Sequence, residues 1–287
     1  MKLLNVLLTP CLVLGMTSVP AAECDSECLT THLQHYLFHM QHQDVAELPF
    51  SNDLKSYENA VATRPGEGSW KSIESFPVKG QIFVDAPQGQ IVYYGATKLK
   101  TGIIGSLFIR MKVENDEITE TEMFTKGAYT REGESTEGLL EPDILYTAVV
   151  PSHRLSSREE LVKIVDLYMD GISKHDGSVF PASGRCDRYQ AGNKFTNRYI
   201  EQFDKTMGGC QSSMDSLQGQ TVVDRRFPVV DEELGIVAVF FIIPHAERDP
   251  QNATNVAEIF KIVDGKVRSI EEFSFVGTYP PFSGFAE

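Results

Sequence analysis

The sequence is poor in basic residues and in the short motifs that mark common enzyme classes. Of its 287 residues, 26 are lysine or arginine, against 40 aspartates and glutamates. This balance disfavours a polyanion-binding surface, so we expect no nucleic-acid partner. The sequence also contains no Walker loop, no dinucleotide-binding glycine motif, no GxSxG elbow and no metal-protease helix. These absences disfavour nucleotide hydrolysis and cofactor-dependent redox chemistry, and we expect no cofactor.

Beyond the N-terminus, no apolar run is long enough to span a bilayer, so no stable membrane anchor is expected. The N-terminus itself is typical of a secretory signal. Lys2 precedes a mostly apolar stretch over residues 3–16, and small residues follow up to Ala22. The pattern predicts a signal peptide over residues 1–22 and a secreted or periplasmic mature chain.

Cysteine is scarce, and one of the five cysteines, Cys11, lies in the predicted signal. The other four are an even number in an oxidising compartment, which indicates two disulfides in one of three connectivities. We favour Cys186–Cys210, worth roughly 3 kcal/mol, with Cys24–Cys28 as a small local ring. A zinc site is the alternative, but the CxxxC spacing and the long gap after Cys186 match no recognised metal motif, and we assign no metal ligand.

An internal repeat is the main positive feature of the sequence. It aligns Tyr36 with Tyr168 without a gap, and further on it places Glu122 over Glu271. Three blocks in the same order indicate a tandem duplication. The matching blocks are 36–57 with 168–189, 84–92 with 230–237, and 112–115 with 261–264.

Each copy begins with helical periodicity and ends with β-rich segments, so we predict an α+β unit over residues 23–150 and another over 151–287. Apolar residues three and four positions apart predict one helix around residues 29–40 and a second around 161–172, the latter capped by Ser156 or Ser157. Strands are predicted at 90–94, 106–113, 236–243 and 256–263, with hairpin turns at Asn115-Asp116 and Asp264-Gly265.

Four histidines, at positions 32, 35, 39 and 42, fall on the first predicted helix. A helical wheel places them beside or opposite the apolar face. We therefore expect a solvated histidine surface, which could bind metal adventitiously, and no built metal site.

Several short motifs in both halves add a family resemblance. They are Tyr57-Glu58-Asn59, Gly66 to Trp70, Ile118 to Glu122, Cys186 to Tyr189, Arg226 to Gly235 and the tail from Tyr279 to Phe285. Together they resemble a family of secreted fungal and bacterial proteins with two units of the nuclear-transport-factor-two-like fold, the fold of ketosteroid isomerases and SnoaL-like cyclases. The second half departs from the family pattern at Gln190-Ala191 and at Phe285.

The resemblance implies two tandem cystatin-like cones, each with N-terminal helices packed on a curved antiparallel sheet. It also implies an apolar pocket between the helices and the concave face of each sheet. Because units of this fold commonly pair through their sheets, the two copies are expected to form an intrachain pseudo-dimer.

Glu122 and Glu271 are the paired catalytic candidates. Strand alternation places Glu122 on one face with Ile118 and Phe124, and Glu271 on one face with Val267 and Phe273. A carboxylate on an apolar face has its pKa raised by desolvation and can act as a general acid or base. The alternatives are an outward-facing side chain or an ion pair with an arginine such as Arg110 or Arg226.

The ligand-binding candidates carry hydroxyl, charged or large aromatic side chains. A tyrosine hydroxyl can donate to a substrate oxygen, whereas Trp70 could be core or a lid, and Asp187 with Arg188 could be a structural pair. The candidates are Tyr57, Glu58, Trp70, Asp187, Arg188, Tyr189 and Arg226.

Two functions are compatible with these residues. The first is an exported protein that binds a small hydrophobic or aromatic molecule in a cone-shaped pocket. The alternative is a cofactor-independent isomerase, cyclase or lyase that uses a buried glutamate and a tyrosine donor.

Overall fold

The structure is a computed structural model that describes residues 24–127, 136–201, 204–216, 220–245, 249, 251–278 and 285. The predicted signal peptide and positions 279–284 of the tail motif lie outside the described residues. Within the described ranges, no helix is both long and apolar enough to cross a membrane.

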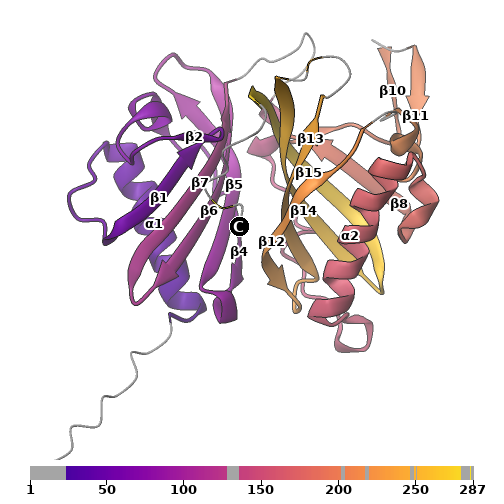
Figure 1. The fold of residues 1–287 in the computed structure, drawn as a ribbon, viewed down its shortest axis with the longest axis horizontal. Helices are drawn as coiled ribbons and strands as arrows, with labels where there is room; N and C mark the ends of the chain where they lie inside the picture. Colours follow the sequence, from indigo (N-terminus) through magenta and orange to yellow (C-terminus); the bar gives the residue numbers. More distant parts are fainter. Residues whose placement is uncertain are drawn as a thin grey trace, which may run out of the picture.

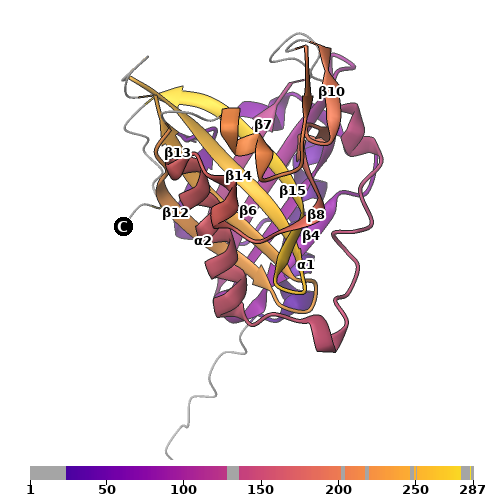
Figure 2. The ribbon, with the colours of Figure 1, turned by 90° about the vertical axis from the view of Figure 1, so that its right-hand side faces the viewer.

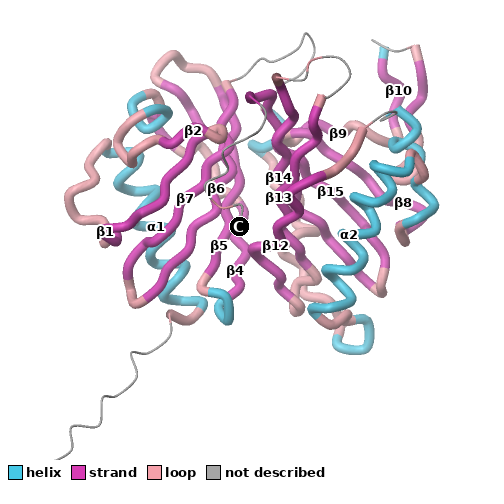
Figure 3. Tube along the Cα trace, viewed as in Figure 1, coloured by secondary structure: helices cyan, strands magenta, loops and turns pink. Residues whose placement is uncertain are grey.

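Each half of the chain packs one long helix on one mixed sheet, which confirms the predicted α+β class (Figures 1 and 3). In the first half, α1 (Ser26–His42) covers a sheet of order β2-β1-β7-β6-β5-β3, with β4 paired to β5. The strands are β1 (Phe50–Glu58), β2 (Val61–Ala62), β3 (Ile73–Ser75), β4 (Gln81–Asp85), β5 (Gln90–Leu99), β6 (Ile104–Glu114) and β7 (Glu117–Lys126).

The second half repeats this arrangement with α2 (Arg158–Lys174) and a sheet of order β12-β13-β14-β15-β8-β9. A separate hairpin is formed by β10 and β11. The strands are β8 (Ala182–Gln190), β9 (Asn193–Lys194), β10 (Arg198–Ile200), β11 (Lys205–Met207), β12 (Val223–Asp231), β13 (Ile236–Pro244), β14 (Asn252–Val263) and β15 (Lys266–Thr278).

Local capping chemistry sets where both helices begin. The Asp25 side chain accepts a hydrogen bond from the Cys28 N–H at the start of α1. At the start of α2, Ser157 and Glu160 form a reciprocal capping box, which confirms Ser157 as the cap. The expected histidine surface is wrong for His32, which is buried and lies with its Nε2 2.8 Å from Asp116 Oδ1.

The long hairpins turn where the sequence predicts. Asn115 and Asp116 have φ of 53° and 64° and join β6 to β7, and Asp264 and Gly265 have φ of 59° and 64° and join β14 to β15. Two successive residues with positive φ match the twist of an antiparallel hairpin. This register brings Ile109 opposite Met123 in the first half and Glu258 opposite Glu272 in the second.

The same register irregularity recurs next to both turns and corrects the predicted strand faces. The pairing shifts between Lys112 and Val113 in one half and between Lys261 and Ile262 in the other. One extra residue reverses the facing of every side chain beyond it. Ile118 and Val267 consequently pack in the helix-side cores and do not share a face with Glu122 and Glu271.

The fully antiparallel sheets implied by the resemblance are also corrected. β1 pairs with β7 in parallel, and β8 pairs with β15 in parallel. A parallel neighbour cannot be joined by a tight hairpin. In each half these two strands are separated by the rest of the unit, so the chain has enough length to enter the sheet in either direction.

The two sheets face each other, and the two helices lie on the outer sides (Figures 1 and 2). Each helix side encloses its own apolar core, while a third core joins the sheets. Aromatic rings dominate the third core, with Phe108 and Phe240 5.4 Å apart and Phe124 and Phe275 4.8 Å apart. Both predicted disulfides, Cys24–Cys28 and Cys186–Cys210, are confirmed.

Candidate functional site

A pocket lies where the two sheets meet the segment that connects them, rather than between a helix and its sheet. About 400 Å³ of atom-free space lies in it, including space that opens to solvent. Three distant parts of the chain form its wall: β5, the segment over residues 138–146, and the second sheet with its β8–β9 turn. The segment over residues 138–146 is called the connector below. The lining residues are Tyr94, Gly95, Gly138, Leu139, Glu141, Pro142, Asp143, Tyr146, Tyr189, Gly192 and Glu271.

Close backbone packing holds the connector against the second sheet. A β-carbon at Gly138 would collide with the carbonyl group of Gly192, and Gly192 has a φ of 84°, which favours glycine. Farther along the connector, the Tyr146 hydroxyl donates to Ser269 Oγ at 2.9 Å. These contacts fix the outer wall of the pocket.

Glu271 is the central polar group of the pocket. Its side chain is 5% exposed, and Oε1 accepts the Gly192 N–H at 2.8 Å. Burial raises the pKa of this carboxyl to about 8, helped by the negative charges of Glu272 and Asp143 and opposed by the Gly192 hydrogen bond. No ion pair of the described residues includes Glu271. The carboxyl is therefore mostly protonated at neutral pH and can donate a hydrogen bond.

Three tyrosines provide the aromatic part of the wall. Tyr94 and Tyr146 are buried, and their rings meet nearly edge to face at a centroid distance of 6.1 Å. Burial raises the pKa of both hydroxyls and of Tyr189, so all three remain neutral. Glu141 and Asp143 are exposed at the mouth. An aromatic wall, a neutral carboxyl and an acidic mouth suit an uncharged molecule better than an anion.

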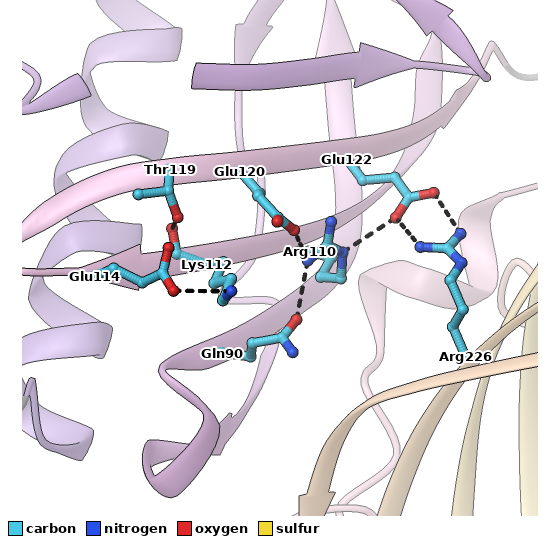
Figure 4. A network of polar contacts seen from close by, with 8 residues as sticks. All are labelled: Gln90, Arg110, Lys112, Glu114, Thr119, Glu120, Glu122 and Arg226. Atoms are coloured by element: carbon cyan, nitrogen blue, oxygen red, sulfur yellow. Dashed lines mark hydrogen bonds and ion pairs between the residues drawn. The ribbon is translucent and has the colours of Figure 1, made fainter. Parts of the chain in front are cut away.

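Glu122 occupies the equivalent strand position in the first half and has the opposite surroundings (Figure 4). Arg226 crosses from the second sheet and donates to both of its oxygens, at 2.9 and 3.0 Å. Arg110 Nε donates to it at 3.1 Å. Burial alone would raise the pKa of Glu122, but the two arginines outweigh burial and lower it. Glu122 is thus a fully paired carboxylate.

Aromatic rings cover this ion cluster. The Phe285 ring lies 4.3 Å from the Arg110 guanidinium and 5.1 Å from the Tyr57 ring. The structure therefore gathers Tyr57, Glu122 and Arg226, all named from the sequence, into one cluster. The pairing leaves Glu122 without the protonated state that Glu271 has, so this cluster is less suited to proton transfer.

A second buried polar cluster lies inside the second cone, and of its four residues only Arg188 was a candidate from the sequence. The Tyr168 hydroxyl donates to Glu258 at 3.0 Å, Arg188 pairs with Glu272, and Arg188 Nε lies 3.8 Å from Glu258. Burial raises the pKa of Glu258 to about 8, and the effects of Arg188, Glu272 and Tyr168 are smaller. The available signal was a glutamate within the mostly apolar predicted strand at 256–263.

The remaining sequence candidates lie away from the pocket. Glu58 accepts hydrogen bonds from the Ser69 N–H and hydroxyl at 2.9 and 2.6 Å, so it caps a short helical turn. Trp70 is fully buried against Tyr36, with ring centroids 4.9 Å apart, as expected for a core residue. Asp187 accepts from the Asn197 amide at 2.7 Å.

Comparison with known families matches residues 154–274 to the family described as "Domain of unknown function (DUF8021)". The match lies within the second half of the chain and covers less than half of the sequence. No curated protein matches the chain.

Several solved structures are similar to this chain over less than half of its length. A cystatin-like protein of unknown function from Methylobium petroleophilum is 17% identical, with 46% of this chain and 85% of that one covered and a TM-score of 0.33. AusH from Aspergillus nidulans is 15% identical, with 42% and 86% covered and a TM-score of 0.29. An NTF2-like protein of unknown function from Cytophaga hutchinsonii is 8% identical, with 40% and 89% covered and a TM-score of 0.28.

Proposed function

We propose that this chain binds a small, uncharged aromatic molecule in the pocket between its sheets, with the protonated Glu271 carboxyl donating a hydrogen bond to an acceptor on that molecule. The observation that carries the proposal is a buried carboxyl that faces a tyrosine-lined pocket and has no cationic partner among the described residues. A buried carboxyl without a cation is costly for stability alone, and groups with strongly perturbed pKa values concentrate at functional sites.

The ligand chemistry follows from the protonation state of Glu271. A neutral carboxyl donates to a carbonyl or ether oxygen, whereas its ionised form repels electron-rich atoms. Acetophenone, an aromatic ring with one carbonyl acceptor, is therefore a suitable probe. Benzoate has nearly the same shape and carries a negative charge, so we expect it to bind at least tenfold more weakly.

The test is the dissociation constant of acetophenone, measured by ligand-observed NMR at pH 6.5 and at pH 9.5. Wild-type protein is expected to bind at least tenfold more weakly at the higher pH, because Glu271 loses its proton near pH 8. Glu271→Gln keeps an N–H donor, so its affinity is expected to be independent of pH. Glu271→Ala removes the donor and is expected to weaken binding about tenfold, as for one lost hydrogen bond.

Glu117→Gln is the matched control, because Glu117 is exposed at the start of β7 and its substitution makes the same change in charge. Its affinity and its pH dependence are expected to match those of the wild type. Binding that is unchanged in Glu271→Ala, or independent of pH in the wild type, would contradict the proposal.

We infer proton transfer next to a carbonyl as the second candidate function, on the observation that the pKa of Glu271 lies near neutral pH. In this reaction the ionised carboxylate removes a proton from the carbon beside the carbonyl and returns one to the enolate. Exchange of the acetophenone methyl protons in D2O, followed by NMR, tests it. Glu271→Gln is expected to retain binding and lose exchange; equal exchange in both proteins excludes this function.

Export of the chain is also proposed, on the basis of the N-terminal signal pattern and two disulfides. Mass spectrometry of the mature protein from its natural source is expected to find Glu23 at the N-terminus. An intracellular protein that retains residues 1–22 would contradict export.

The proposed intrachain pseudo-dimer rests on contacts between the sheets. These include the aromatic core and the Asp85 carboxylate, which accepts the Val230 N–H at 2.9 Å and pairs with Arg158 at 2.7 Å. Small-angle scattering is expected to show one compact body, and two loosely tethered bodies would contradict the proposal.

A further inference from the structure

The start of α1 carries a second group of chemically reactive side chains, in the first half of the chain and on the helix side of its sheet. Cys28 and His32 lie one turn apart on α1, so their side chains share one side of the helix. Cys24 precedes the cap residue Asp25 and is held beside them by its disulfide to Cys28. Their sulfur and nitrogen atoms all lie within 4.8 Å of one another. Neither the spacing of the cysteines nor that of the histidines predicts this group when each is taken alone.

A fourth donor reaches the group from the β6–β7 turn. Asp116 Oδ1 lies 2.8 Å from His32 Nε2 and 3.9 Å from Cys28 Sγ. The residue is the second of the two turn residues with positive φ, at 64°. His32 is buried, which fixes its ring beside the two sulfurs.

We propose that these four residues form a redox-controlled zinc site, which is closed by the Cys24–Cys28 disulfide and opens when that disulfide is reduced. Two thiolates, an imidazole and a carboxylate are a donor set that suits tetrahedral Zn²⁺. The disulfide and the metal exclude each other, because both need the same two sulfurs. This site is independent of any ligand of the pocket between the sheets.

The chemistry balances with a low-molecular-weight thiol such as glutathione as the reductant. Two glutathione molecules reduce the Cys24–Cys28 bond and leave as glutathione disulfide, and the protein retains two thiols. Both thiols release their protons to solvent when Zn²⁺ binds the thiolates. Cys24 and Cys28 are half-buried, so a small thiol can approach them, whereas Cys186 and Cys210 are each 1% exposed.

The second disulfide provides an internal comparison. In the described part of the chain, no group of metal-ligating side chains surrounds Cys186 and Cys210. Reduction of that pair alone is therefore expected to create no zinc site. Any metal that binds tightly to reduced protein should depend on Cys24 and Cys28.

The experiment titrates Co²⁺, as a spectroscopic substitute for Zn²⁺, into the full chain after anaerobic reduction and removal of the reductant. We expect one equivalent to bind with sulfur-to-cobalt charge-transfer absorption and the intense visible bands of a tetrahedral site, and Zn²⁺ to displace it. Untreated, disulfide-bonded protein is expected to show neither absorption. Trp70 fluorescence checks that each protein remains folded, because this residue is buried against α1 in the same core.

Variants assign the ligands. Cys24→Ser combined with Cys28→Ser is expected to abolish the thiolate absorption, and Asp116→Asn to weaken Zn²⁺ binding by about 10- to 100-fold. His35→Gln, on the exposed side of the same helix, is the control and is expected to leave binding unchanged. The proposal is overturned if reduced wild-type protein lacks the thiolate bands, if the double variant keeps them, or if oxidised protein binds the metal equally well.

Discussion

Glu122 and Glu271 occupy equivalent positions in the two halves of the molecule and have opposite electrostatics. Each lies on the strand that comes last in the sequence of its half, β7 or β15. Its partner across the parallel pairing is a tyrosine, Tyr57 in the first half and Tyr189 in the second. Two arginines hold Glu122 as a carboxylate, whereas Glu271 has no cationic partner among the described residues and its pKa is raised. The two halves share the position of the carboxyl group but not its protonation state.

The interiors of the two cones differ in the same way. In the first cone, Ile109 of β6 pairs with Met123 of β7, and the Tyr36 hydroxyl lies 3.6 Å from the Met123 sulfur. In the second cone, the residues at the equivalent positions are Glu258 of β14 and Glu272 of β15, and the Tyr168 hydroxyl donates to Glu258. The first cone is therefore an apolar core, while the second contains buried charge. Both comparisons place the unusual ionisation states in the second half.

The sharpest test of the comparison substitutes the two glutamates in turn. Glu122→Gln is expected to lower the free energy of unfolding by about 3–5 kcal/mol at pH 7, because the guanidinium groups of buried Arg110 and half-buried Arg226 lose this carboxylate. Glu271→Gln is expected to cause no loss, because the amide resembles the protonated carboxyl and its oxygen can still accept the Gly192 N–H. Urea unfolding monitored by circular dichroism measures both, and equal losses would remove the distinction.

The pH dependence of stability gives the next largest effect. The raised pKa of Glu271 means that the folded protein keeps a proton that the unfolded chain has already lost. Stability from this group is therefore complete below its ordinary pKa of about 4.5 and is lost as the pH rises toward about 8. Between pH 5 and pH 8, wild-type protein is expected to lose about 3–4 kcal/mol more than Glu271→Gln.

The pKa of Glu122 is shifted in the opposite direction to that of Glu271, so its effect on the pH dependence of stability has the opposite sign. Its lowered pKa contributes stability above the ordinary glutamate range, and this stability is lost as the pH falls. Glu122→Gln is therefore expected to flatten the acid side of the stability curve, and Glu271→Gln the neutral and alkaline side. The pKa of Glu258 is also raised, but Glu258 is present in both the wild type and Glu271→Gln. Its contribution therefore cancels when the stabilities of the two proteins are subtracted. Parallel curves for Glu271→Gln and the wild type would show that Glu271 titrates normally.

The smallest expected effect compares the two equivalent tyrosines. Tyr168→Phe removes the hydroxyl that donates to buried Glu258 and is expected to cost about 1–3 kcal/mol of unfolding free energy. Tyr36→Phe removes a hydroxyl that contacts a methionine sulfur, a weak acceptor, and is expected to cost about 0.5 kcal/mol. Chemical denaturation of both variants under identical conditions is the measurement. A larger loss for Tyr36→Phe would show that the first cone depends on its polar group more than the second.

The features predictable from the sequence depend on neighbouring residues. Ser157 caps α2 through its own helix, the turns at Asn115 and Asp264 depend on backbone conformations that these residues tolerate, and the repeat indicated that the unit occurs twice. The disulfide pairing followed from the parity of the cysteines and their spacing. Each of these features can be recognised from a short stretch of sequence or from the number and spacing of one residue type.

The location of the pocket could not be predicted in the same way. It depends on how two sheets and a connector meet, and on a register shift that moves Ile118 and Val267 to the faces opposite those expected from simple alternation. Glu271 was found because the repeat aligned it with Glu122. The difference between them arises from Arg226, which reaches Glu122 from the other half, and this contact depends on the relative placement of the sheets.

The close contact between Gly138 and Gly192 joins the connector to the second sheet at the pocket, and this arrangement links ligand binding to the association of the two halves. Because one wall of the pocket belongs to each half and a third wall to the connector, a molecule held there contacts all three. Its binding is therefore linked to the association of the halves: a ligand at 100 times its dissociation constant would oppose their separation by about 2.7 kcal/mol. Mechanical or chemical separation of the two sheets would in turn expel the ligand, so occupancy and docking of the halves would report on each other.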